Sequence, residues 1–162
     1  MKKFQNKKPV IAIDGTAASG KGTLSKKIAN FLNFDHLDTG LLYRFIALKR
    51  INGENELVKI DYQKIKAIDL TNKNITKVSS LVARENKVRR RLLDFQRSFA
   101  NSPPSSNGSV IDGRDIGTVV IPNAEVKFFI DADIEVRAKR RFLDHASNGE
   151  NIEYEFVLQK LK

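Results

Sequence analysis

The sequence predicts an α/β fold in which helices flank a central, mostly parallel β-sheet. The first observation is the apolar run 10–13, which has the length and composition of a strand buried on both faces. The second is the glycine-rich turn that follows it and leads into apolar residues at helical spacing from Lys21 onward. The third is a further strand and helix between His36 and Ile46, because alternating strands and helices are typical of parallel sheets.

The middle of the chain is predicted to be helical. Asp61 is placed to cap a short helix around Ile65, and a second helix is expected over 75–82. Between Val88 and Phe99 apolar residues recur at steps of 4, 3 and 4, the clearest amphipathic pattern in the chain. We expect these helices to form an arm over the sheet.

After the arm, the chain is predicted to return to the sheet. Proline, serine, asparagine and glycine make 101–108 a loop, and 109–111 and 126–130 are predicted strands. Asp133 is expected to cap a helix that runs through Arg141. A last helical segment leads to the C-terminus.

Composition narrows the class of protein before any motif is considered. A chain of 162 residues has the length of one domain, and 41% hydrophobic with 30% charged residues is an ordinary globular composition. The sequence has no cysteine, which excludes disulfides and thiolate metal sites and is typical of a cytoplasmic protein. The N-terminal segment is not a secretion signal, and no apolar stretch is long enough to span a membrane. The net charge of +10 favours phosphate-bearing ligands without choosing among nucleotides, nucleic acids and lipid headgroups.

The turn after the first strand has the spacing of a phosphate-binding loop. Two glycines, Gly15 and Gly20, stand five positions apart, and Lys21 follows the second directly. Backbone N–H groups of such a loop point inward at an anion, the next helix presents its positive end, and the lysine reaches the outer phosphates of ATP. The hydroxyl expected after the lysine arrives one position late, at Thr23, which favours metal contact through water. The loop that we expect to hold ATP comprises Gly15, Thr16, Ala17, Ala18, Ser19, Gly20, Lys21, Gly22 and Thr23.

Four motifs in order resemble those of bacterial cytidylate kinases, which are P-loop kinases that act on nucleoside monophosphates. The resemblance covers most of the chain and lies in residues 11–23, 37–44, 112–120 and 126–141. It implies that the γ-phosphoryl group of ATP is transferred, with Mg²⁺, to CMP or dCMP, giving ADP and CDP or dCDP. The expected divisions are a core at about 9–50 and 108–141, a helical acceptor-binding arm at about 51–107 and a partial lid at 137–162.

Phosphoryl transfer depends on positioning and charge neutralisation, so Lys21 and two arginines are the expected catalytic groups. Arg44 and Arg114 follow strands of the predicted sheet, where parallel sheets bind ligands, and their planar forks suit the acceptor phosphate. Asp38 matches an acceptor-site carboxylate of the family, and Asp115 matches the position that reads cytosine. A carboxylate accepts from the exocyclic amine of cytosine, which uracil lacks.

Other assignments have plainer alternatives that stay open. Asp112 is placed to hold Mg²⁺ through water or simply to form a turn, and Asp38 to act as a helix cap. Arg44 also fits a solvated helix residue. Arg137, Arg140 and Arg141 are expected to begin a lid that closes on ATP, although a solvated helix face explains each of them equally well.

Two further groups of residues are expected to play no part in the site. The basic residues 87–91 are interpreted as an exposed face of the helix that carries Phe95. His36 and His145 are interpreted as incidental, because no metal-like spacing surrounds them.

Two departures from the family pattern bear on function. The segment between Arg50 and Val78 is shorter than the usual acceptor-binding insertion and contains no arginine that could contact the base. Thr71 and Thr76 are candidates to replace a hydroxyl group that the family pattern has in this insertion. The family pattern also continues beyond Lys162 into a lid, a last strand and a helix.

Three competing hypotheses stay open. The protein could use another acceptor, such as UMP, AMP or a non-nucleotide, it could be an ATP-binding remnant without turnover, or its net charge of +10 could serve RNA binding. We expect small-molecule nucleotide partners, no nucleic acid, no membrane, a monomer and a cytoplasmic location.

Overall fold

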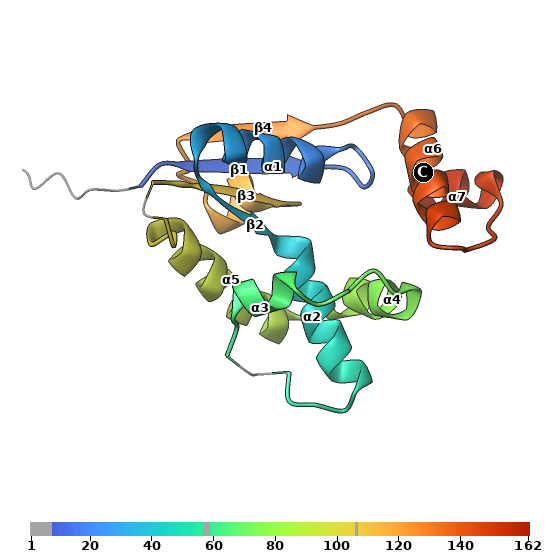
Figure 1. Cartoon of the computed structure of the whole chain (residues 1–162), viewed down its shortest axis with the longest axis horizontal. Coiled ribbons are helices and arrows are strands. Elements are labelled where there is room, and N and C mark those ends of the chain that lie inside the picture. Colours follow the sequence, from blue (N-terminus) through green and yellow to red (C-terminus); the bar gives the residue numbers. More distant parts are fainter. Residues whose placement is uncertain (1–7, 57–58, 106) are drawn as a thin grey trace, which may run out of the picture.

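The computed structural model describes residues 8–56, 59–105 and 107–162. Its strands form one parallel sheet in the order β2-β3-β1-β4, with α1 on one face and α2 to α5 on the other (Figure 1). The predicted α/β class with a parallel sheet is therefore confirmed. The strands are β1 (Val10–Gly15), β2 (Asp35–Asp38), β3 (Ser109–Gly113) and β4 (Val126–Ile130).

The first strand lies at the centre of the fold because apolar side chains cover both of its faces. Every residue of β1 is buried. Ile11 and Ile13 pack with Ala29 of α1 (Lys21–Leu32), whereas Val10 and Ala12 belong to the larger core under the arm helices. Burial on both faces explains the continuous apolar run, since a half-exposed strand would alternate.

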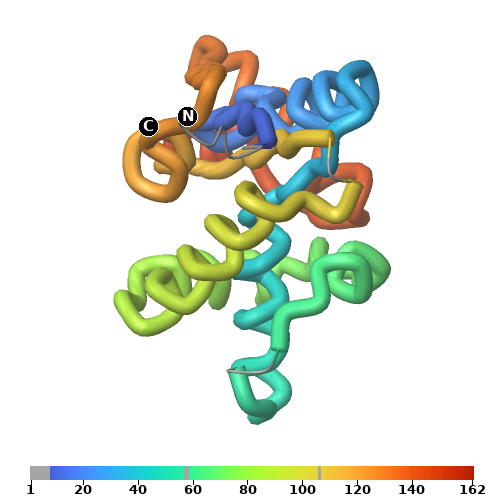
Figure 2. Tube along the Cα trace, turned by 90° about the vertical axis from the view of Figure 1, so that its left-hand side faces the viewer, coloured from blue at the N-terminus to red at the C-terminus, as the bar shows by residue number. Residues whose placement is uncertain are grey.

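The arm helices begin where side chains cap them. Asp38 caps α2 (Thr39–Ile51) through Leu41 N, and Asp61 caps α3 (Tyr62–Lys66) through Lys64 N, so the prediction for Asp61 is confirmed. Asn72 caps the next helix in the same way. Below the sheet these helices form a separate layer, seen from the side in Figure 2. The later arm helices are α4 (Lys73–Val82) and α5 (Asn86–Asn101).

The first helix after β4 begins where it was predicted to begin but is longer than expected. Asp133 occupies the N-cap position of α6 (Ile134–Ser147), as predicted, although its side chain makes no capping hydrogen bond. The helix also continues past Arg141, because apolar Phe142 packs edge-on against Tyr154 of α7 (Tyr154–Leu161), with ring centroids 6.1 Å apart. These helices lie at the end of the sheet where the phosphate-binding loop emerges (Figure 1).

A short π-helix, η1 (Ile116–Val120), follows β3 and was not predicted. The buried carboxylate of Asp14 accepts hydrogen bonds from Ile116 N at 2.7 Å and Gly117 N at 2.8 Å. At the other end, Arg97 of α5 donates to the carbonyls of Val119 and Val120. These contacts fix the turn on which Arg114 and Asp115 lie.

Candidate active site

The phosphate-binding loop joins β1 to α1, as the motif predicts. Gly20 has a φ of +93°, which favours glycine, and it occupies the N-cap position of α1. Gly15 is required for a different reason, since a Cβ there would lie 2.2 Å from the carbonyl oxygen of Ile130. Steric constraints therefore explain why glycine occupies both positions of the motif.

The loop leaves polar groups available for an anion. No side chain caps α1, and its first turn carries no acidic residue, so the positive end of a 12-residue helix is uncompensated. The hydroxyl oxygen of Ser19 is buried without a hydrogen-bond partner. Such groups normally have partners in folded proteins, which indicates that the loop is shaped for a bound phosphate.

Lys21 connects this loop to the next strand of the sheet. Its Nζ lies 3.7 Å from Oδ1 of Asp112, while Oδ2 of the same carboxylate lies 2.6 Å from Nε2 of His36. Asp112 is buried, with a side chain only 3% exposed. The interpretation of His36 as incidental was therefore wrong, because a buried carboxylate requires polar partners and the histidine is one of them.

The predicted acceptor-side residues lie beside this carboxylate. Asp38 and Asp112 are register partners in the parallel pair β2 and β3. Asp38 caps α2, as its plainer interpretation held, and its Oδ2 also lies 3.5 Å from Nη2 of Arg44. The Nε of Arg44 is buried without a partner, so this guanidinium has a donor available for a ligand.

A second guanidinium approaches the phosphate-binding loop from the other side. Arg114 donates to the carbonyl oxygen of Gly15 at 3.2 Å. Burial lowers the pKa of the Arg114 guanidinium, and the charges of Arg141 and Arg137 lower it further. Three arginines thus converge near the loop, where an anionic ligand would relieve their mutual repulsion.

The arginines of α6 contact different partners, which the sequence did not indicate. Arg137 donates to the carbonyl of Ala132 at 2.9 Å, whereas Arg140 donates to the carbonyl of Ser19 at 2.8 Å. Of the three α6 arginines expected to begin the lid, Arg140 is therefore the one that contacts the phosphate-binding loop directly. No signal in the sequence distinguished it from its neighbours.

A pocket of about 340 Å³ lies between α2, α5 and η1, and Asp115 lines it. Nη2 of Arg89 makes a short ion pair with Oδ2 of Asp115. The interpretation of residues 87–91 as only an exposed basic face was thus wrong for Arg89, although Lys87 is exposed. An arginine of α5 therefore lines the pocket beside Asp115, although segment 51–77 contains none. The pocket is lined by Tyr43, Asn86, Arg89, Arg90, Leu93, Gln96, Asp115, Val119 and Val120.

Tyr43 and Gln96 complete the inner wall of this pocket. Gln96 is 2% exposed and hydrogen-bonds the Tyr43 phenol. Burial raises the pKa of Tyr43, while the nearby Arg89 charge opposes that rise. Sequence analysis missed both residues, because the amphipathic pattern of α5 marks positions as inward-facing and does not reveal which buried position is polar.

The residues expected to hold Mg²⁺ fit a metal bound mainly by phosphates. Asp112 is a buried carboxylate beside Lys21, while Thr23 is exposed on the first turn of α1. Within the described ranges, His, Cys, Asp and Glu form no cluster of three that would hold a metal alone. Mg²⁺ commonly takes one or two carboxylates together with waters and substrate phosphates, so this donor set is adequate only with nucleotide present.

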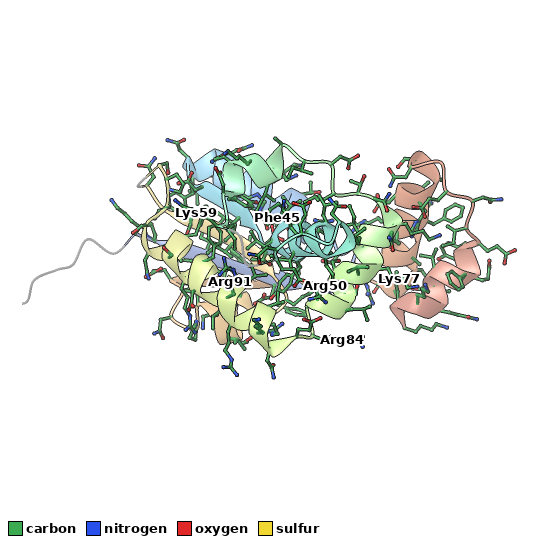
Figure 3. The ribbon with its side chains drawn as sticks, turned by 90° about the horizontal axis from the view of Figure 1, so that it is seen from below. Phe45, Arg50, Lys59, Lys77, Arg84 and Arg91 are labelled. Atoms are coloured by element: carbon green, nitrogen blue, oxygen red, sulfur yellow. The ribbon has the colours of Figure 1, made fainter. Side chains whose placement is uncertain are left out.

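Other features lie away from this site. A cavity of about 600 Å³ between α3 and the end of α5 is lined by aromatic rings and lysines and does not reach the phosphate-binding loop. Figure 3 labels Lys59, which precedes α3, on the opposite side of the arm from Lys77 of α4 and Arg84 in the turn after α4. Part of the positive charge is therefore spread over the arm rather than gathered into one stripe.

The fold and the site together define a class of protein. A buried parallel strand, a loop with anion-binding geometry, a helix and converging arginines are the parts of a P-loop phosphotransferase. The sequence profile of the cytidylate kinase family matches residues 11–68 and 55–162, and the chain belongs to that family.

Individual relatives agree with this assignment. The cytidylate kinase of Paramagnetospirillum magneticum is 42% identical over 163 residues, which cover 94% of this chain and 77% of that protein. That of Bartonella bacilliformis is 44% identical, and the match covers 94% of this chain and 74% of the relative. The chain thus spans about three quarters of the length of these relatives.

Among solved structures, an uncharacterized protein from Eubacterium ventriosum is similar with a TM-score of 0.53. It is 19% identical, and the match covers 95% of this chain and 69% of that one, which supports the fold alone. None of the helices that the structure describes is long and apolar enough to cross a membrane.

Proposed function

We propose that this protein transfers the γ-phosphoryl group of ATP to CMP or dCMP, giving ADP and CDP or dCDP. The observation that carries the proposal is the placement of Lys21, Asp112 and Asp38. The lysine of the phosphate-binding loop lies 3.7 Å from Asp112, whose register partner Asp38 contacts Arg44. A donor site and an acceptor site therefore lie next to each other across one strand.

The residues divide the work of phosphoryl transfer. Backbone N–H groups of 15–23 and Lys21 hold the donor phosphates, and Arg44 holds the acceptor phosphate. Arg114, between the loop and the lid arginines Arg137 and Arg141, stabilises charge on the transferring group. An acceptor phosphate oxygen attacks the γ-phosphorus while the bond to the β–γ bridging oxygen breaks, and ADP leaves. The acceptor phosphate, with a second pKa of about 6, needs no general base near neutral pH.

We assign Mg²⁺ to Asp112 and Thr23, through water, together with the ATP phosphates. The metal would neutralise charge on the β- and γ-phosphates. Asp112 is suited to hold an outer-shell water because His36 and Lys21 orient its two oxygens. Metal dependence is checked by comparing turnover in Mg²⁺ with turnover in excess chelator.

Arg89 and Asp115 support cytosine as the base. The cytosine edge offers an N4 amine donor beside the N3 and O2 acceptors, whereas uracil has an O4 acceptor at that position. A carboxylate beside a guanidinium presents the complementary acceptor and donors, and both groups line one pocket. UMP would place its O4 against the Asp115 carboxylate, which is repulsive.

A coupled ADP-release assay with CMP, dCMP, UMP and AMP tests the proposal, with Lys21→Ala as the blank. We expect turnover with CMP or dCMP at least about tenfold above that with UMP, a ratio typical of one good polar contact. Equal rates with all four acceptors would reject the cytosine assignment. ATP binding without turnover on any acceptor would favour a nucleotide-binding protein instead of a kinase.

We further infer that the protein acts in the cytoplasm as a monomer on free nucleotides, without nucleic acid. The inference is supported by the candidate residues, which all come from one chain and surround sites of nucleotide size. Size-exclusion chromatography with light scattering checks the monomer, and a gel-shift assay with RNA checks for nucleic-acid binding.

A further inference from the structure

Tyr62 is a buried residue of the arm that the proposed mechanism does not use. It is the first residue of α3, a helix that Asp61 caps, and it is 6% exposed. Its ring packs edge-on against Phe99 of α5, with centroids 6.0 Å apart at an angle of 76°. The ring is thus held by two arm helices, which fixes where its hydroxyl group lies.

The hydroxyl group of Tyr62 reaches the strand that leads to the acceptor site. Its oxygen accepts a hydrogen bond from the backbone N of Asp38 at 2.8 Å. Asp38 ends β2, which is at the edge of the described sheet and pairs only with β3 there. The phenol therefore supplies an acceptor to a strand end that has a neighbouring strand on one side only.

Asp38, whose backbone this hydrogen bond holds, contacts two parts of the proposed acceptor site. From the same Asp38, Oδ1 accepts from Leu41 N at the start of α2, and Oδ2 lies 3.5 Å from Arg44. A shift of this backbone moves the carboxylate, the first turn of α2 and the guanidinium together. The phenol oxygen therefore links α3 to the strand end that positions Arg44, in addition to the packing of α3 against α2.

The hydroxyl group of Tyr62 stays protonated at physiological pH. Burial raises the pKa of Tyr62 to about 12, and the charges of Asp38 and Asp112 act in the same direction. The side chain is a neutral phenol across the physiological range, so the contact does not titrate there.

We propose that Tyr62 is a positioning residue for the acceptor site, through which the arm sets the affinity for the nucleoside monophosphate. Its hydroxyl contacts the backbone of Asp38 and its ring packs on Phe99, away from the phosphate-binding loop, so its effect falls on the acceptor and not on ATP. The inference rests on the proposed function, because it takes Arg44, which Asp38 contacts, to bind the acceptor phosphate.

The test compares Tyr62→Phe with Tyr154→Phe. The first keeps the ring and its packing on Phe99 but removes the oxygen that Asp38 N requires. The second removes a tyrosine hydroxyl from α7, where it contacts only the carbonyl of Glu135 at 3.4 Å. For Tyr62→Phe we expect KM for CMP to rise about tenfold, with KM for ATP changed less than twofold. For Tyr154→Phe we expect neither KM to move by more than about twofold, as for an exposed polar contact.

A second measurement tests the hydrogen bond from Asp38 N to Tyr62 without relying on catalytic turnover. Amide hydrogen exchange at Asp38, followed by NMR, should accelerate about tenfold or more in Tyr62→Phe, while exchange at Leu42 stays unchanged. If the wild-type chain phosphorylates no acceptor, the proposed function fails, and faster exchange at Asp38 would still establish the anchor. Equal increases in both KM values, or an unchanged KM for CMP, would overturn the positioning role. A lower melting temperature without a split between the KM values would show that the phenol serves stability only.

Discussion

The phosphate-binding end of the site and the base-binding end are built differently. Residues 15–23 are consecutive, and their groups for a ligand belong to the backbone or to side chains within the same nine residues, those of Ser19, Lys21 and Thr23. The base pocket instead brings together side chains from α2, α5 and the turn before η1, as Tyr43, Arg89 and Asp115 show. A backbone cradle can be recognised from local spacing, whereas a side-chain pocket depends on how distant helices pack.

The largest expected effect belongs to the phosphate end. Lys21→Ala should lower kcat with CMP by about 10²–10³-fold, because a preorganised charge on the transferring phosphates is lost. Steady-state kinetics measure the change, and circular dichroism checks the fold. Lys27→Ala, an exposed lysine on the same helix, is the matched control and should leave kcat unchanged. Similar losses in both variants would mean that the positive field of α1, and not the loop geometry, matters.

A smaller loss is expected from Arg114→Lys, which keeps a positive charge but removes the planar fork. We expect kcat to fall about tenfold to a hundredfold, since lysine cannot contact the loop carbonyl and a phosphate together. Pre-steady-state measurement of the chemical step is the appropriate readout. Arg84→Lys on the exposed turn before α5 is the control. Full activity in the Arg114 variant would mean that this residue contributes only its positive charge and not the geometry of its guanidinium group.

The base end should respond in selectivity and not in overall rate. Arg89→Gln removes the partner of Asp115, and we expect the ratio of kcat/KM for CMP over UMP to fall about tenfold, the value of one good base contact. Competition between the two acceptors in one reaction measures the ratio directly. Lys87→Gln, two residues earlier on the same helix and exposed, should leave the ratio unchanged. An unchanged ratio in Arg89→Gln would remove the pair from base recognition.

Much of the fold could be predicted because its signals are local. The apolar run of β1, the glycines of the loop and the spacing of Val88 and Leu92 each depend on nearby residues, and the structure follows them. The π-helix η1 was missed because its cause is not local. Asp14 accepts hydrogen bonds from Ile116 and Gly117, which lie 102 and 103 residues later in the sequence.

The site shows the same division. Lys21, Asp38, Arg44 and Arg114 were found through motifs, and the structure places them around the loop and the end of β2. His36 and Arg89 were not assigned to the site, and Arg140 was not distinguished from the other lid arginines, because a histidine in a strand or one arginine among several carries no signal until its partner is known. Their partners, Asp112, Asp115 and the carbonyl of Ser19, come from other parts of the chain.

The ion pair between Lys21 and Asp112 has a consequence for how the nucleotide enters. Without ATP the lysine already has an internal counter-ion at 3.7 Å, and the aspartate is almost wholly shielded from solvent. Arrival of the triphosphate therefore exchanges one negative partner for another instead of neutralising a bare cation. Added salt screens both attractions, so the ionic strength of the buffer should alter ATP affinity less than the number of basic groups around the loop suggests.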